Sequence, residues 1–218
     1  MEPRYERGLD VKNAFFAMVS RMRYINRWAL MRNTRTENIE EHSLQVAVLA
    51  HAIALIRTRF FPLDGNGQAR IAVDPDRVAV LAVYHDAGEI LVGDMPTPIK
   101  YFNADIERAF KSIEKDAVDK LTGMLPPELR GDYTALMLPD RRDPVIDEAM
   151  RIVKAADKIS ALIKCIEEEK AGNTEFVPAS RKLRIVVEET GLPEVDYFVR
   201  HFLPAYGRTL DELEEQPT

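Results

Sequence analysis

His85, Asp86 and Glu89 interrupt an otherwise apolar stretch, RVAVLAVYHDAGEILVGDMPTPIK, which covers residues 77–100. An imidazole and a carboxylate can bind a metal ion, and a second carboxylate can move a proton. On a helix Glu89 lies one turn beyond the His-Asp pair and on the same side of the helix. The surrounding apolar residues recur at helical spacing, so the pattern predicts one helical run that ends at Gly93.

Two further candidate ligands lie far away in the sequence, each within a predicted helix. If His42 and Asp157 meet His85 and Asp86, two imidazoles and two carboxylates form a site suited to Mn, Co, Fe, Mg or Zn. Coordination positions would stay open for water and substrate oxygens, which is typical of a catalytic site. The separations are 43 residues between the two histidines and 71 between the two aspartates. Such spacing is not a diagnostic motif, so it leaves a metal site and unrelated polar residues equally open.

Positive charge gathers around the only tryptophan of the chain, Trp28. Three arginines lie close to it in the sequence: Arg27, Arg32 and Arg35. They fit either a solvated face or a contact with phosphate, which an acidic protein otherwise repels. Another histidine, His51, lies nine residues after His42 and about 180° around the same predicted helix. We therefore expect His51 to pack or to face solvent rather than to join a site with His42.

Apolar residues at three- and four-residue spacing predict helices along nearly the whole chain. The predicted helices cover residues 11–24, 39–61, 75–93, 103–123, 127–137, 147–171, 178–189 and 194–213. Asp10 and Asp74 are candidate N-caps of the first and third helices. Pro96 and Pro98 predict an extended loop after the third helix. We find no alternating strand of useful length, so the predicted fold class is all-α.

Two apolar faces and one thiol receive structural interpretations. The second helix is expected to bury four residues on one side: Leu44, Val48, Ala52 and Leu55. The last helix carries three aromatic residues for the core or for a subunit contact: Tyr197, Phe198 and Phe202. Cys165 cannot form an internal disulfide, and we interpret it as a small core or interface residue in a reducing compartment.

Length and composition indicate a soluble globular protein. The chain has 218 residues, 46% of them hydrophobic and 30% charged. We predict a single domain over residues 1–218, with a core at about 11–171 and C-terminal helices at about 178–213. The net charge of −6 implies no general attraction to nucleic acid or anionic lipid. We see no apolar run near the length of a membrane span and no apolar signal core at the start, so we expect a cytoplasmic protein.

Three stretches carry a resemblance that covers nearly the whole chain: INRWALMRNTRTENIEEHSLQVA, YHDAGEILVGDMPTPIKYFN and VKAADKISALIKCIEEEKAGNTEF. With them the sequence resembles the HD-domain metal-dependent phosphohydrolases, and more narrowly the bacterial 5'-deoxynucleotidases of that superfamily. The resemblance implies a helical HD-domain fold, one divalent ion such as Co or Mn, and a homodimer. The matching metal ligands are His42, His85, Asp86 and Asp157. The residues matched to nucleotide contacts are Arg27, Trp28, Asp94, Met95, Pro96 and Thr97, and we expect His42, Asp86 and Asp157 to touch the substrate as well.

The reaction that the resemblance implies is hydrolysis of a deoxynucleoside 5'-monophosphate to deoxynucleoside and phosphate. Glu89 would orient or deprotonate the attacking water, and Arg27 would clamp the phosphate. Trp28 would place a rigid ring against the sugar and leave no room for a 2'-hydroxyl. Asp94 would accept from the sugar 3'-hydroxyl or deliver a proton to the leaving oxygen. Lys100 is either a further phosphate contact or a solvated lysine.

Two alternatives stay open from the sequence. One is another HD-domain enzyme, a nucleotide pyrophosphohydrolase or an alarmone hydrolase; the alarmone enzymes resemble His-Asp-x-x-Glu-Asp at this helix, whereas here Ile90 follows Glu89. The other is a non-catalytic helical binding protein, against which the complete set of candidate ligands argues.

Overall fold

Helices account for almost all regular structure in residues 13–100 and 102–214, which are the residues described by the computed structural model of this chain. Within them, β-type pairing is limited to two isolated bridges, Asn26 with Asn38 and Leu63 with Ala69. The all-α fold class predicted from the sequence is therefore confirmed.

The elements follow one another along the chain, with two longer non-helical segments at residues 25–38 and 61–74. The α-helices are α1 (Phe15–Val19), α2 (Ile39–Phe60), α3 (Pro75–Tyr84), α4 (Glu89–Val92), α5 (Thr97–Lys100), α6 (Ala104–Thr122), α7 (Pro127–Met137), α8 (Pro144–Lys170), α9 (Val177–Glu188), α10 (Pro193–His201) and α11 (Leu210–Glu214). Three short 3₁₀ helices accompany them: η1 (Ser20–Tyr24), η2 (Thr174–Phe176) and η3 (Leu203–Gly207).

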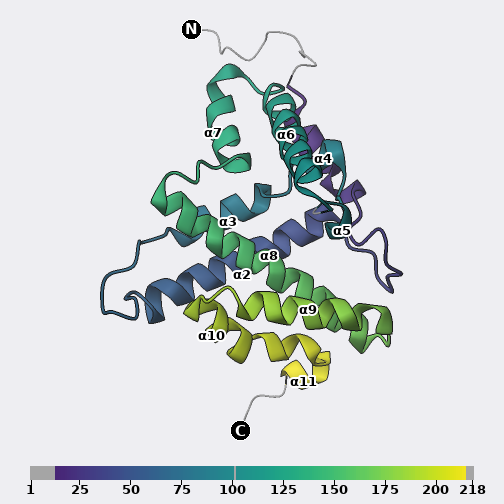
Figure 1. Cartoon of the computed structure of the whole chain (residues 1–218), viewed down its shortest axis with the longest axis vertical. Coiled ribbons are helices and arrows are strands. Elements are labelled where there is room, and N and C mark those ends of the chain that lie inside the picture. Colours follow the sequence, from purple (N-terminus) through teal and green to yellow (C-terminus); the bar gives the residue numbers. More distant parts are fainter. Residues whose placement is uncertain (1–12, 101, 215–218) are drawn as a thin grey trace.

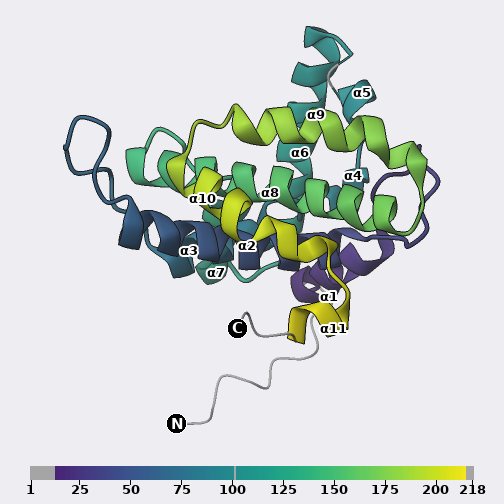
Figure 2. The same cartoon turned by 90° about the horizontal axis from the view of Figure 1, so that it is seen from below.

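Helices α2 and α8 cross the middle of the molecule, with α6 and α7 towards one end and α9 to α11 towards the other (Figure 1). Helix α2 packs against α3, α8 and α10, and α9 packs against α8. Figure 2, which views the molecule from below, shows α9 and α10 covering α8 and α2 on that side. The larger core lies between α2, α3, α8 and α10, and a smaller core joins α1, η1, α4 and α6. Tyr84 and Tyr133 pack against both cores.

The buried face of α2 differs from the predicted one. Leu44 and Val48 are 66% and 61% exposed, and Leu55 is also exposed, so that part of the prediction was wrong. The helix buries another side instead, including His42, Leu49 and Ile53. Because α2 is apolar on nearly every side, its periodicity could not choose the face that packs against α3 and α8.

Helix α2 also corrects the expectation that no run approaches the length of a membrane span. Its 22 residues contain an 18-residue window with a mean hydropathy of 1.3, and it is the one described helix long and apolar enough to cross a membrane. However, 56% of that window is buried inside the protein. The central helix of a globular core has the same composition, so this feature is weak support for a span.

The predicted run at 75–93 is interrupted in the structure. The side chain of Asp74 caps α3 as expected, accepting from the backbone N–H of Asp76. However, α3 ends at Tyr84, and residues 85–88 form turns before α4 begins. Gly93 then ends α4 at a φ of 78°, in the region that favours glycine. The predicted extended loop is wrong in part, because α5 forms one helical turn within it.

Both ends of the chain also differ in detail from the prediction. The first helix changes to 3₁₀ geometry at Ser20, and its candidate cap Asp10 lies outside the described residues. The predicted helix at 194–213 divides into α10, η3 and α11, because Pro204 has no N–H with which to continue the helix. Of its three aromatic residues, Phe198 is buried, Tyr197 is half-buried and Phe202 is 46% exposed. Cys165 is a free, buried core residue, and burial raises the pKa of its thiol to about 12.

Candidate active site

The four candidate ligands converge on one point between the two cores. His42 comes from the first turn of α2, His85 and Asp86 follow α3, and Asp157 lies in the middle of α8. The Nε2 atom of His42 is 3.2 Å from Asp157 Oδ1 and 3.6 Å from Asp86 Oδ2, and His85 Nε2 is 3.1 Å from the same Asp86 oxygen. One ligand atom each from His42, His85 and Asp157 lies within 4.8 Å of the others. Three segments that are distant in the sequence therefore supply a single cluster.

Hydrogen bonds at Nδ1 fix the orientation of both imidazole rings. His85 Nδ1 lies 2.7 Å from the carbonyl oxygen of Ala82, which can only accept, so this nitrogen carries the proton. Ser160 donates its hydroxyl proton to Gln45 at 2.6 Å, so His42 Nδ1 is the donor to Ser160 at 3.1 Å. Both rings thus direct Nε2 at the carboxylates.

Two buried Nε2 atoms face carboxylate oxygens, an arrangement that a shared cation can satisfy. Neither His42 Nε2 nor His85 Nε2 has a hydrogen-bond partner among the described residues. Burial, followed by the charge of Arg27, lowers the pKa of His42. Burial also acts to lower the pKa of His85, but the nearby carboxylate of Asp86 outweighs it and raises that pKa. Two imidazoles and two carboxylates fit a divalent metal ion at this position.

Glu89 lies next to the cluster and is itself buried. Glu89 is the first residue of α4, and its Oε2 atom has no hydrogen-bond partner in the described part of the chain. Burial raises the pKa of Glu89 to about 9, assisted by repulsion from Asp86 and Asp94. A carboxylate in this environment is a candidate for proton transfer.

Arg27 and Trp28 form a wall beside the cluster. Arg27 is mostly buried, and its Nη1 atom is 3.5 Å from Asp86 Oδ2. Trp28 has a φ of 60°, which is unusual for a bulky residue, and its ring packs against Phe176 with 5.3 Å between ring centroids. The other two arginines near Trp28 face outward: Arg32 pairs with Glu175 and Arg35 with Glu41.

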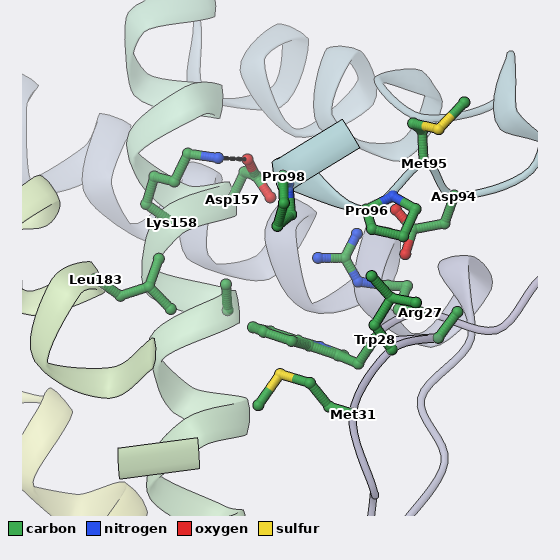
Figure 3. A pocket seen from close by; sticks show the side chains of 13 residues that line it. Arg27, Trp28, Met31, Asp94, Met95, Pro96, Pro98, Asp157, Lys158 and Leu183 are labelled. Atoms are coloured by element: carbon green, nitrogen blue, oxygen red, sulfur yellow. Dashed lines mark hydrogen bonds and ion pairs between the residues drawn. The ribbon is translucent and has the colours of Figure 1, made fainter. Parts of the chain in front are cut away.

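A cavity of about 240 Å³ opens from Asp157 towards α9. Figure 3 shows the Arg27 guanidinium reaching into it from above the Trp28 ring, with Asp94 and Pro96 on one side and Leu183 opposite. Its lining residues are Arg27, Trp28, Ala29, Leu30, Met31, Asp94, Met95, Pro96, Pro98, Asp157, Lys158, Ala161 and Leu183. The cavity is therefore apolar at the α9 end and charged next to the cluster.

The structure brings most of the predicted site residues to this cavity or to the cluster behind it. The predicted nucleotide contacts Asp94, Met95 and Pro96 line the cavity, whereas the side chain of Thr97 lies outside the described part of the structure. Lys100 does not line it and pairs with Glu114 at 2.7 Å. His51 lies elsewhere and contacts Asp76 at 3.2 Å.

The sequence reasoning missed several residues that the structure places here. Lys158 lines the cavity and contacts Asp157 at 2.8 Å, and its position next to a candidate ligand was a usable signal. Leu183 reaches the cavity from α9, and no pattern around it indicated that role. Glu37 accepts hydrogen bonds from both Arg27 and Trp28, and no pattern around it indicated that role.

Comparison with solved structures defines the fold. An HD-domain phosphohydrolase from Listeria innocua superposes with a TM-score of 0.69 at 20% sequence identity, covering 88% of this chain and 87% of that one. The HD phosphohydrolase DatZ of cyanophage S-2L, solved with dA and one catalytic Zn²⁺ ion, gives a TM-score of 0.57 at 18% identity, covering 86% and 95%. The helical architecture is thus that of HD-domain phosphohydrolases.

Sequence comparison identifies the family within this class. Residues 14–206 match the model of the YfbR-like 5'-deoxynucleotidases, and the chain belongs to that family. The 5'-deoxynucleotidase YfbR of Shigella flexneri serotype 5b is 48% identical over 201 residues, which are 92% of this chain and 96% of that protein. The family resemblance inferred from the sequence is confirmed.

Proposed function

We propose that this protein is a metal-dependent 5'-deoxynucleotidase, which hydrolyses deoxynucleoside 5'-monophosphates to deoxynucleosides and phosphate. The observation that carries the proposal is the convergence of two buried imidazole Nε2 atoms and two carboxylates beside a cavity walled by Arg27 and Trp28. Family membership supports this reading over an alarmone hydrolase, a pyrophosphohydrolase or a non-catalytic helical protein.

His42, His85, Asp86 and Asp157 would hold one divalent ion, such as Co or Mn. When bound, such an ion polarises a phosphate oxygen and lowers the pKa of a coordinated water. Arg27 would clamp the phosphate, because its Nη atoms lie between the cluster and the cavity. Glu89 would orient the attacking water, or take its proton once positive charge beside Asp86 has offset one of the repulsions that raise the pKa of Glu89.

The cavity beyond Arg27 would receive the nucleoside. Trp28 presents a ring to the sugar, and a ring in close contact excludes a 2'-hydroxyl. Asp94 would accept from the 3'-hydroxyl or protonate the leaving 5'-oxygen, and Met95, Pro96 and Thr97 would complete that wall. The side chains of Met31 and Leu183 offer apolar surface to a base but no hydrogen-bonding groups that would distinguish one base from another.

The direct test is phosphate release by metal-stripped protein. We expect no release from dAMP in excess chelator, recovery on addition of Mn²⁺ or Co²⁺, and a much lower rate with AMP. His85→Ala should abolish both metal binding and turnover. Unchanged activity in excess chelator, or hydrolysis of an alarmone or a nucleoside triphosphate in preference to dAMP, would refute the proposal.

We also propose that the protein is a cytoplasmic homodimer of single-domain subunits. The net charge of −6 gives no general attraction to polymeric nucleic acid or to an anionic membrane. The exposed row Leu44, Val48 and Leu55 on α2 offers a more continuous apolar surface for a second copy than the C-terminal aromatic residues, of which only Phe202 is well exposed.

A further inference from the structure

Glu37 holds both residues of the arginine-tryptophan wall with one oxygen atom. Its Oε2 accepts a hydrogen bond from Arg27 Nε at 3.1 Å and another from Trp28 Nε1 at 2.9 Å. The side chains of Arg27 and Glu37 are only 12% and 13% exposed. The backbone carbonyl of Glu37 also accepts from the N–H of Arg27 at 2.9 Å. This residue lies just before α2 and does not line the nucleotide cavity.

The contact with Arg27 divides the work of the guanidinium group. Nε is occupied by Glu37, so the two Nη nitrogens remain for other partners, and Nη1 points at Asp86. A guanidinium fixed at Nε presents a planar fork in one direction. Glu37 therefore directs the Arg27 side chain towards the place where a phosphate would lie.

The contact with Glu37 holds the ring of Trp28, a residue whose backbone is strained. A φ of 60° is strained for a bulky residue and persists only where surrounding contacts impose it. The hydrogen bond holds one edge of the indole, Phe176 packs against the ring, and the ring lies along the cavity (Figure 3). The indole N–H of Trp28 carries no charge. Its hydrogen bond to Glu37 is therefore not needed for the ion pair between Glu37 and Arg27.

We infer that Glu37 is a positioning residue that determines the preference for deoxyribose, by holding the indole of Trp28 where a 2'-hydroxyl would have to fit. This inference rests on the proposed function. A wall that excludes one oxygen atom must be rigid, because a displacement of about 1 Å opens the space that it denies. Glu37 supplies that rigidity from outside the cavity.

A single tryptophan makes the position of the ring measurable without turnover. Because Trp28 is the only tryptophan, its time-resolved fluorescence anisotropy reports the motion of this indole alone. Glu37→Met fills similar space but cannot accept a hydrogen bond, and we expect a larger fast component in the anisotropy decay. Glu37→Gln keeps an acceptor and should restore the slow decay of the wild type. Glu41→Met, a change at an exposed glutamate of α2, is the matched control and should behave as wild type.

Substrate discrimination tests the same variants by function. The ratio of kcat/KM for dAMP to that for AMP should fall by about tenfold or more in Glu37→Met and stay within about threefold of wild type in Glu37→Gln. In a Trp28→Phe background, Glu37→Met should lower the ratio no further, because phenylalanine lacks the indole N–H that donates to Glu37. Glu37→Ala serves in place of Glu37→Met if circular dichroism shows that the methionine variant does not fold.

The outcomes separate the two proposals. Suppose that the wild type hydrolyses dAMP in preference to AMP, and that a folded Glu37→Met protein shows the same ratio and the same anisotropy decay. This result overturns the role of Glu37 and leaves the deoxynucleotidase proposal standing. Wild type that does not hydrolyse dAMP overturns the proposed function and this inference with it.

Discussion

Glu89 holds a proton that an unfolded chain would release. Its pKa in the folded, metal-free protein is about 9, against an ordinary value of 4.5, mainly because it is buried. Between these two pH values the folded state binds more protons than the unfolded state, so the free energy of unfolding falls as the pH rises. The contribution of one such group is at most about 1.4 kcal/mol per pH unit.

Replacement by glutamine removes this titration while keeping the shape of the side chain. We predict that metal-free Glu89→Gln gains stability relative to wild type as the pH rises from about 6 to about 8, and that its unfolding free energy depends less on pH. Urea unfolding at both pH values measures this, with Glu41→Gln as an exposed control. Identical pH dependence in wild type and Glu89→Gln would show that Glu89 is already ionised in the folded protein.

Arg27 is predicted to contribute to catalysis through the geometry of its fork and not through charge alone. Arg27→Ala should lower kcat/KM for dAMP by about 10²–10³-fold, the typical loss of one oriented donor to a developing charge. Arg27→Lys should recover little, since an ammonium group cannot bind Glu37 and a phosphate in the same fixed geometry. Arg32→Ala is the control, because Arg32 is exposed and paired with Glu175. Full activity of Arg27→Lys would reduce the role of Arg27 to a point charge.

At the scale of elements, Glu168 fastens the segment after Trp28 to the end of α8. Its carboxylate accepts from the backbone N–H and the hydroxyl of Thr34 at 2.9 and 2.7 Å, from Asn173 at 2.8 Å, and from Lys164. Although burial acts to raise the pKa of Glu168, these donors outweigh it and lower that pKa. Because the pKa of Glu168 is lower in the folded protein than in the unfolded chain, the ionised carboxylate stabilises the fold at pH values above its ordinary pKa. This stability is lost as the pH falls towards the folded-state pKa.

Glu168→Ala should therefore destabilise the protein by about 3–5 kcal/mol near neutral pH, because it leaves the buried Lys164 without its carboxylate. The double variant Lys164→Met with Glu168→Leu removes both charges and should recover much of that loss. Urea unfolding near pH 7 measures each variant. A single variant as stable as wild type would show that the segment is held by its other contacts.

Periodicity predicted where helices exist but not where they turn. The bounds of α6 and α7 agree closely with the prediction because clear signals mark their ends: Asn103 caps α6, and Pro127 begins α7. No comparable signal marks the break at residues 85–88. There, backbone hydrogen bonds from i+3 to i replace those of the α-helix, and the His85 ring donates a hydrogen bond to the carbonyl oxygen of Ala82. That break turns His85 and Asp86 towards His42, a tertiary outcome that spacing along one segment could not express.

Residue chemistry singled out the candidate ligands, but not the residues that support them. Histidine and aspartate in apolar helices stand out in a sequence, whereas Glu37 looks like any acidic residue near a helix start. Leu183 reaches the cavity only because α9 folds back over α8. Such residues depend on tertiary packing, which is why the local pattern did not reveal them.

For the whole molecule, the proposed homodimer predicts a particle of twice the 24.8 kDa chain in sedimentation velocity. If the exposed row on α2 is the contact, Leu44→Lys combined with Val48→Lys should yield a folded monomer, because burying two ammonium groups from each subunit would destabilise the contact by more than its apolar surface stabilises it. Phe202→Ser tests the C-terminal surface by the same measurement. Neither α2 position touches the ligand cluster, so circular dichroism and metal binding should stay unchanged. A monomeric wild type refutes the dimer, and dissociation by Phe202→Ser alone moves the contact to the C-terminal helices.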